Sequence, residues 1–307
     1  MTDRAPFPYA GEVAALSSSV LWACAGIAFR RMKGRADPGA VNLAKNSTAA
    51  VCFVVMLLVT TGLPWPTGLS TSAVLLLAGS GVLGLTVCDT LFLRALFEVG
   101  PRRANLVMAG LASMLVFVVT LLPPFDQAGE LSGVRPWIGF ALALAGLWLA
   151  TREMPEGPHD PAANRRGLRD AGLAALFQAA GVLLSRLASE TGAPAREATS
   201  VRLLSGSAGL VVLGVVAGRA RPWARSLAAP GVLPRLALAA FFGTFLGIWL
   251  NQAGITWADS TGVATVLNSL APVWLIPLSA VFLGERHRRD AWLATLVALA
   301  GVALLSL

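Results

Sequence analysis

Long apolar runs constrain the fold of this chain more than any other feature. An α-helix rises about 1.5 Å per residue, so crossing roughly 30 Å of hydrocarbon takes about 20 mainly apolar residues. The sequence holds ten such runs, at residues 11–30, 40–61, 73–97, 103–122, 134–151, 170–188, 198–217, 235–256, 260–283 and 289–307. It therefore predicts an all-α integral membrane protein with ten transmembrane helices.

The overall composition agrees with a lipid environment. Of the 307 residues, 56% are hydrophobic and 13% are charged, whereas about 25% of residues are charged in soluble domains. The net charge of +8 would suit a nucleic-acid partner, but the basic residues form short clusters between the apolar runs. Such clusters are typical of loops that orient a membrane protein. We therefore predict contact with a lipid bilayer and no binding of nucleic acid.

The polar, proline-bearing segment 152–169 divides the ten runs into two sets of five. We predict two five-helix repeats, residues 11–151 and 170–307, joined by this linker. Because five is odd, similar halves would enter the bilayer from opposite sides and form an inverted repeat. Many secondary transporters have this architecture, with the binding site near the middle of the membrane.

Sequence similarity between the halves supports the repeat. "WIGFALALAGLWL" at 137–149 resembles "WLATLVALAGVAL" at 292–304, and residues 84–112 align without gaps with 243–271. Matches between apolar sequences arise easily by chance. The order and spacing of the runs is therefore the stronger indication of two repeats.

Loop charges predict the orientation of the chain. The loops after the odd-numbered runs hold sixteen lysines and arginines, whereas the other side holds Arg4, Arg135 and Arg196. Positive loops stay in the cytoplasm. Both termini are thus expected outside the inner (plasma) membrane, with the linker in the cytoplasm.

Asp89 is the acidic residue that lies deepest in a predicted span, within "LGLTVCDTLFLRALFEVG" at 83–100. The polar loop from Glu98 is nine residues away, about 13 Å along a helix, so a short carboxylate cannot reach it. A charged aspartate at a helix centre costs about 2.5–3.5 kcal/mol, so Asp89 should face a cavity. The alternative is a structural, protonated acid bonded to a neighbouring helix. Arg94, close to the loop, is interpreted as an interface anchor.

Four amides and one tryptophan are further candidates for binding or coupling. By the same depth argument, Asn251, Asn268 and Gln178 lie about 12–14 Å from the nearest polar loop, and Gln252 adjoins Asn251. Their alternative role is hydrogen bonding between helices. Trp22 falls inside a span, where it would line a cavity or pack in the core.

Other polar and special residues have less specific interpretations. Lys45 and Arg202 occupy like places early in the second and seventh spans, where we expect both to extend toward the headgroups, with a charge at the mouth of a cavity as the alternative. Pro272 and Pro277 should loosen the ninth span, because each removes a backbone donor. Neither cysteine nor histidine spacing indicates a disulfide or metal site, and no cofactor is expected.

Residues 267–305, "LNSLAPVWLIPLSAVFLGERHRRDAWLATLVALAGVALL", resemble the carboxy-terminal end of EamA-like transporters of the drug/metabolite transporter superfamily. The shared pattern is a proline-bearing ninth helix, the turn Leu283-Gly284-Glu285 and a tenth helix around Gly301. The resemblance implies two oppositely oriented five-helix repeats, a central substrate cavity and alternating access. The first half departs from the pattern, since Ser113 aligns with Pro272. Family members are often drawn with cytoplasmic termini, opposite to the orientation that the loop charges favour here.

Three functional hypotheses follow. The first is a secondary transporter of a small polar metabolite or drug-like solute, with proton coupling through Asp89 as an additional hypothesis. The second is a flippase for a lipid-linked substrate, which would share the fold and open laterally. The third is an intramembrane enzyme, against which the sequence lacks HExxH and GxSxG motifs and paired carboxylates at depth.

Overall fold

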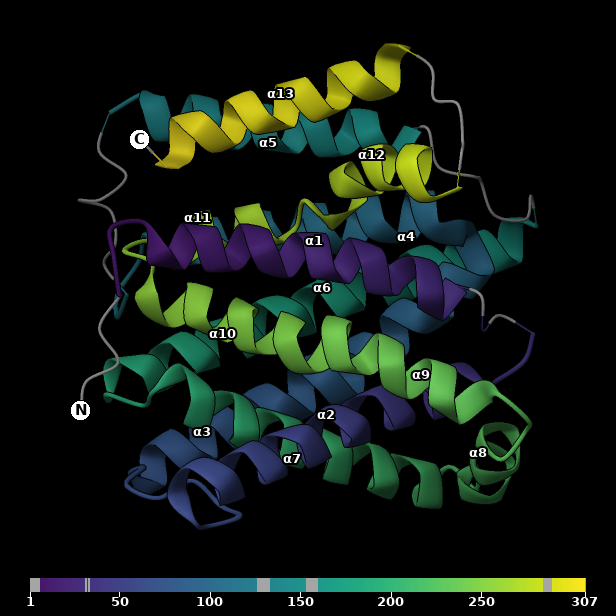
Figure 1. The fold of residues 1–307 in the computed structure, drawn as a ribbon. Coiled ribbons are helices and arrows are strands. Elements are labelled where there is room, and N and C mark those ends of the chain that lie inside the picture. The colour runs from purple at the N-terminus through teal and green to yellow at the C-terminus, as the bar shows by residue number, and fades with distance from the viewer. Residues whose placement is uncertain are drawn as a thin grey trace.

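A computed structural model describes residues 6–30, 32, 34–125, 133–152, 160–283 and 289–306, which contain helices and no strand. The helices run side by side in one bundle (Figure 1). The elements are α1 (Ala10–Arg30), α2 (Pro38–Thr61), α3 (Thr71–Gly81), η1 (Val82–Cys88), α4 (Asp89–Val119), α5 (Arg135–Arg152), α6 (Pro161–Glu190), α7 (Ala195–Val216), α8 (Ala220–Leu227), α9 (Val232–Ala240), η3 (Phe241–Leu246), α10 (Gly247–Trp257), α11 (Thr261–Asn268), α12 (Ala271–Leu283) and α13 (Arg289–Ser306).

Six helical stretches are long and apolar enough to cross a membrane, judged by length and composition. They are Pro38–Thr61, Thr71–Gly100, Pro161–Glu190, Ala195–Val216, Val232–Trp257 and Thr261–Leu278, and Arg103–Val119 and Arg135–Leu149 are shorter apolar helices. The chain is therefore a multi-pass membrane protein. Gly100, with φ 78° and ψ 167°, breaks α4 and separates two of these stretches.

One predicted boundary is displaced by a helix cap. The predicted linker, residues 152–169, is in part helical, because α6 begins at Pro161. The side chain of Asp160 accepts hydrogen bonds from the backbone of Ala162 and Ala163, at 2.9 Å and 3.3 Å. An aspartate cap followed by proline in the first turn is a strong start signal for a helix.

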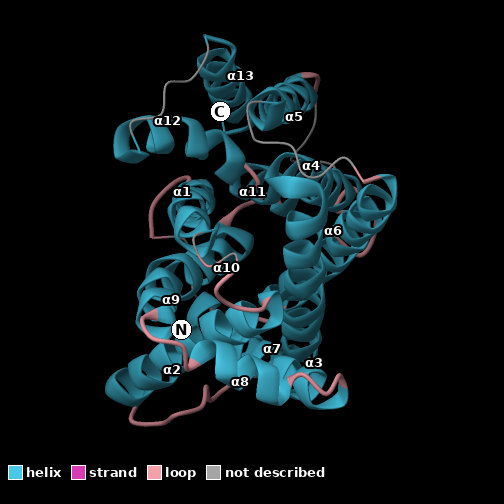
Figure 2. Cartoon of the chain, turned by 90° about the vertical axis from the view of Figure 1, so that its right-hand side faces the viewer, coloured by secondary structure: helices cyan, strands magenta, loops and turns pink. Residues whose placement is uncertain are grey.

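The helices pair across the two halves of the sequence. α1 packs on α10, α2 on α7, α3 and η1 on α6, α11 on α4, and α5 on α13. In Figure 2, α5, α12 and α13 lie at one end of the bundle, and α2, α3, α7 and α8 lie at the other. In Figure 1, α1 begins and α13 ends on the same side, whereas α5 ends and α6 begins on the opposite side.

Small residues allow these helices to approach closely. Gly243 of η3 and Gly254 of α10 face alanines of α1: a Cβ added at Gly243 would lie 2.1 Å from the Cβ of Ala25. Between α5 and α13, a Cβ at Gly146 would lie 2.6 Å from the Cβ of Ala298. Lipid gives little hydrophobic drive for helix association, so close packing of small residues is the main source of such contacts.

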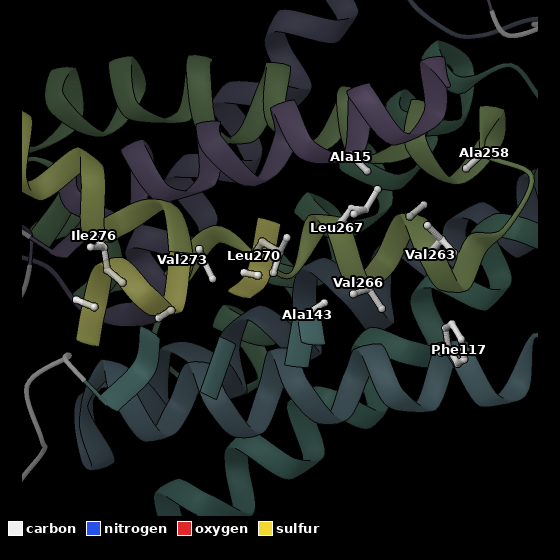
Figure 3. Packing of buried hydrophobic residues seen from close by; sticks show 14 residues of the cluster. Ala15, Phe117, Ala143, Ala258, Val263, Val266, Leu267, Leu270, Val273 and Ile276 are labelled. Atoms are coloured by element: carbon white, nitrogen blue, oxygen red, sulfur yellow. The ribbon is translucent and has the colours of Figure 1, made fainter. Parts of the chain in front are cut away.

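The largest apolar cluster surrounds α11 and α12 (Figure 3). Val266, Leu267 and Leu270 are at most 1% exposed and pack between Ala15 of α1 and Phe117 of α4. This packing joins the N-terminal helix to the C-terminal part of the chain. It also fixes the position of α11, which is only eight residues long.

The ninth predicted span is broken between α11 and α12, at Ser269 and Leu270. Pro272 explains the break, because it has no N–H to donate to the carbonyl of Asn268. The predicted loosening is therefore found at Pro272, whereas α12 continues through Pro277. Ser113, which aligns with Pro272, lies within the unbroken end of α4.

Two wide helical turns were not predicted from the sequence. The π-helical segments η1 and η3 begin at Val82 and Phe241. In the alignment of 84–112 with 243–271, these two starting positions correspond. The two halves therefore share a local irregularity as well as an order of helices.

Trp223 of α8 is expected to hold this short helix against the bundle. It is 5% exposed, and a Cβ at Gly39 or Gly214 would lie 2.1 Å or 2.7 Å from its ring. Trp223→Ala should lower the free energy of unfolding by about 3 kcal/mol or more, because it leaves a large cavity. Thermal unfolding in detergent measures this, with Trp65→Ala as the exposed control. Equal stability of the two variants would contradict the anchoring role.

Candidate functional site

A polar cluster surrounds the junction of η1 and α4, where helices from both halves meet. Several side chains bond to the backbone near the wide turn: Asn42 Nδ2 donates to the carbonyl of Leu85 at 3.0 Å, and Thr86 Oγ1 donates to the carbonyl of Gly206 at 2.8 Å. Thr90 Oγ1 donates to the Thr86 carbonyl at 2.6 Å. π-helical turns recur at functional sites, and this one is stabilised by α2 on one side and α7 on the other.

Asp89 forms an ion pair with Lys45 of α2. Lys45 Nζ lies 2.5 Å from Asp89 Oδ2, and the side chains are 13% and 24% exposed. The expectation that Lys45 extends to the headgroups is therefore wrong, since its ammonium points at the partly buried carboxylate of Asp89. Arg94, which the sequence analysis interprets as an interface anchor, is exposed on the same helix.

Arg202 of α7 is the second cation of the cluster, and it does not extend to the headgroups either. Its side chain is 3% exposed, and Nη1 donates to Gln252 Oε1 at 2.7 Å. Gln252 is fully buried, with Nε2 3.4 Å from Thr256 Oγ1 and 3.5 Å from Ser189 Oγ. The guanidinium lies beside η1, because a Cβ added at Gly84 would be 3.6 Å from Arg202 Nη2.

The cluster is therefore unbalanced in charge. Lys45 and Arg202 contribute two positive charges, and Asp89 contributes one negative charge. Cations buried away from water need a partner, because desolvation of an unpaired charge costs several kcal/mol. Arg202 Nε is buried and has no hydrogen-bond partner among the described residues.

Three of the six predicted site residues contact the two cations or the η1 turn. Asp89 pairs with Lys45, Gln252 accepts from Arg202, and Cys88 Sγ, at the end of η1, lies 3.5 Å from Gln178 Oε1 of α6. Asn251 is 6% exposed on α10, beside Gln252 in sequence. No hydrogen bond joins Asn251 to the cluster in the described part of the chain.

The other two predicted residues lie apart from these contacts. Asn268 ends α11 at the break in the ninth span, with Oδ1 buried and unpartnered among the described residues. Trp22 packs against the apolar cluster that contains Phe53 and Ile248. A Cβ at Gly247 would lie 2.7 Å from its Nε1. Trp22 thus fills a notch in the neighbouring helix, as the core-packing alternative predicts.

One sequence signal could have revealed the roles of Lys45 and Arg202. The two residues occupy equivalent places in the second and seventh spans. Each cation reaches the next span of its own half, Lys45 to Asp89 and Arg202 to Gln252.

Within the described ranges, no group of three or more His, Cys, Asp or Glu side chains could hold a metal ion. His159, His287 and Glu285 lie outside those ranges.

Fold and cluster together define a multi-pass helical membrane protein with a buried charged site. Residues 171–307 match the model of the EamA-like transporter family. The resemblance found in residues 267–305 is thereby confirmed, and it agrees with the drug/metabolite transporter superfamily. The family is one of transporters rather than enzymes.

A solved structure shares the fold along nearly the whole chain. Twenty-nine chains match, and one described only as "Crystal structure of protein" has a TM-score of 0.72 at 16% identity, covering 97% of this chain and 96% of its own. At that identity the likeness shows the fold alone. No curated protein matches the sequence.

Proposed function

We propose that the chain is a secondary active transporter that moves a small polar solute across the membrane by alternating access. The observation that carries this proposal is the partly buried cluster of Lys45, Asp89, Arg202 and Gln252, in a chain whose second half matches a transporter family. Ionisable side chains at membrane depth usually mark substrate or ion pathways. Here they lie between α2 and α4 of the first half and α7 and α10 of the second.

The proposed architecture is ten spans in two inverted five-helix repeats. Helix pairing supports it. Exchanging the halves turns the contacts of α1 with α9, η3 and α10 into the contacts of α6 with α3, η1 and the first part of α4. The exchange leaves α2 with α7, α4 with α11, and α5 with α13 unchanged. The corresponding positions of η1 and η3 support it as well. The domain boundaries 11–151 and 170–307 belong to this proposal.

The proposed mechanism places substrate at the contact between the halves. Rocking of one half against the other would expose the cluster first to one side of the membrane and then to the other. A proton bound by Asp89 would break its ion pair with Lys45 and free the ammonium, so loading and release would change with the proton gradient.

The proposed orientation follows the loop charges. Both termini lie outside the inner (plasma) membrane and the linker lies in the cytoplasm, which fits α1 beginning and α13 ending on one side of the bundle (Figure 1). Short loops rich in arginine stay on the cytoplasmic side. Cysteine labelling at loop positions in intact cells measures this orientation.

Asp89→Asn should abolish the dependence of uptake on a pH gradient. Asparagine has nearly the shape of aspartate but cannot take up a proton, so any coupling through this side chain disappears. The measurement is uptake of pooled metabolites by proteoliposomes, with and without an imposed gradient, analysed by mass spectrometry. Glu190→Gln, on the exposed end of α6, is the control. Normal, gradient-dependent uptake by Asp89→Asn would refute the coupling role.

A flippase for lipid-linked substrates is the second candidate, because one apolar groove faces outward. It has a volume of about 360 Å³ and lies between α2 and η3, lined by Val51, Val55, Val59, Phe241 and neighbouring side chains. Val59 is 81% exposed there, so an acyl chain could lie against it. Transfer of a fluorescent lipid between leaflets, without uptake of soluble metabolites, would favour this function.

A further inference from the structure

The guanidinium of Arg202 has one edge free within an otherwise packed helix interface. Nη1 is bonded to Gln252, whereas Nε is buried without a partner and Nη2 has no hydrogen bond among the described residues. Nε and Nη2 point their hydrogens the same way, and an arginine uses such paired donors to bind a carboxylate through both of its oxygens. In Arg196 and Arg169 the same two atoms both donate to a single carboxylate oxygen, of Glu197 and of Asp170.

A glycine leaves space beside this edge. A Cβ added at Gly84 of η1 would lie 3.6 Å from Arg202 Nη2, and no other atom outside its own helical backbone would come within 4 Å. By contrast, a Cβ at Gly81, one turn earlier, would lie 2.3 Å from the carbonyl oxygen of Arg202. The wide turn is thus tightly packed at Gly81 and open at Gly84.

The charges of Lys45, Asp89 and Arg202 also favour a negatively charged ligand. Asp89 is already paired with Lys45, so the positive charge of Arg202 is left without a full counter-charge. Gln252 contributes only a neutral oxygen. One added negative charge would make the group of Lys45, Asp89 and Arg202 neutral.

We propose that the transported solute carries a single carboxylate, which binds the Nε and Nη2 edge of Arg202 beside Gly84. This inference rests on the proposed transport function and names its substrate class. A carboxylate is planar and carries one negative charge, so it fits one arginine edge and balances the site. Arg202 is only 3% exposed, so the solute would reach the guanidinium when the halves move apart.

Arg202→Gln should remove the preference for carboxylates. The probes are monocarboxylates paired with their primary amides, from acetate and acetamide to benzoate and benzamide, tested for competition with uptake and for a shift in Tm of the purified protein. Loss of a paired, charged hydrogen bond should raise the half-saturating carboxylate concentration roughly 10- to 100-fold. The amides should have little effect on either protein.

Gly84→Ala tests the same site with Arg202 in place, in case Arg202→Gln fails to fold. Its methyl group fills the space beside Nη2 and should raise the half-saturating concentration roughly fivefold or more. Gly79→Ala is the matched control, because its Cβ meets only Leu184 Cδ1, at 3.4 Å. Equal carboxylate affinity of the two alanine variants would overturn the proposal.

The uptake experiment separates this inference from the transport function. Uptake of neutral or cationic solutes that Arg202→Gln leaves unchanged would refute the carboxylate site and leave transport intact. Absence of all uptake would refute transport, and the Tm shifts would then decide the inference alone. A shift with carboxylates that Arg202→Gln loses would support the site, and no shift would overturn it.

Discussion

Lys45→Met is expected to reduce uptake at least roughly tenfold and also to destabilise the protein, because it leaves Asp89 without its counter-charge. Removing one partner of a buried ion pair costs about 3–5 kcal/mol. The lower end applies here, since the side chain of Asp89 is 24% exposed. Unfolding in detergent and uptake by proteoliposomes measure the two effects separately.

A double variant separates stability from transport. Lys45→Met combined with Asp89→Leu removes both charges, so no unpaired charge remains and stability should return to near that of the unmodified protein. Uptake should remain as low as in Lys45→Met alone. Arg94→Gln, an exposed change on the same helix as Asp89, should leave both measurements unaltered. Restored uptake in the double variant would show that the ion pair has only a structural role.

Helix positions were largely predictable from the sequence, because apolar run length is a direct consequence of membrane thickness. The observed α2, Pro38–Thr61, begins two residues before the predicted 40–61. The start of α6 was missed because the cap at Asp160 lies in a polar segment with no apolar pattern. The short α8 was missed because eight residues give too little periodicity.

The site was predictable only in part. Depth in a helix, which can be counted along the chain, made Asp89 and Asn251 candidates, and Gln252 followed as the neighbour of Asn251. The partner of Asp89 could not be predicted, because the pairing with Lys45 depends on how α2 rotates against α4. A long cation near a helix end can extend to the headgroups or turn inward, and the sequence leaves both choices open. The wide turn at η1 likewise depends on contacts with α2 and α7 rather than on local sequence.

Gly81→Ala should lower the free energy of unfolding by about 3 kcal/mol, the upper end for overpacking a tight contact. The new Cβ would lie 2.2 Å from Ser205 Oγ and 2.3 Å from the carbonyl oxygen of Arg202. A serine side chain can rotate away, but a helical carbonyl cannot. The substitution therefore forces α3 and η1 away from α7 and moves the backbone that carries Arg202.

Two comparisons make the Gly81 result specific. Gly79→Ala lies two residues earlier on the same helix and should be neutral or stabilising by about 0.5–1 kcal/mol, because alanine is the better helix former. Combining Gly81→Ala with Ser205→Gly removes the clash with the hydroxyl and leaves the clash with the Arg202 carbonyl, so it should recover only part of the loss. Full recovery in thermal unfolding would show that the hydroxyl alone limits the approach of the helices, and that the position of Arg202 does not depend on the glycine at residue 81.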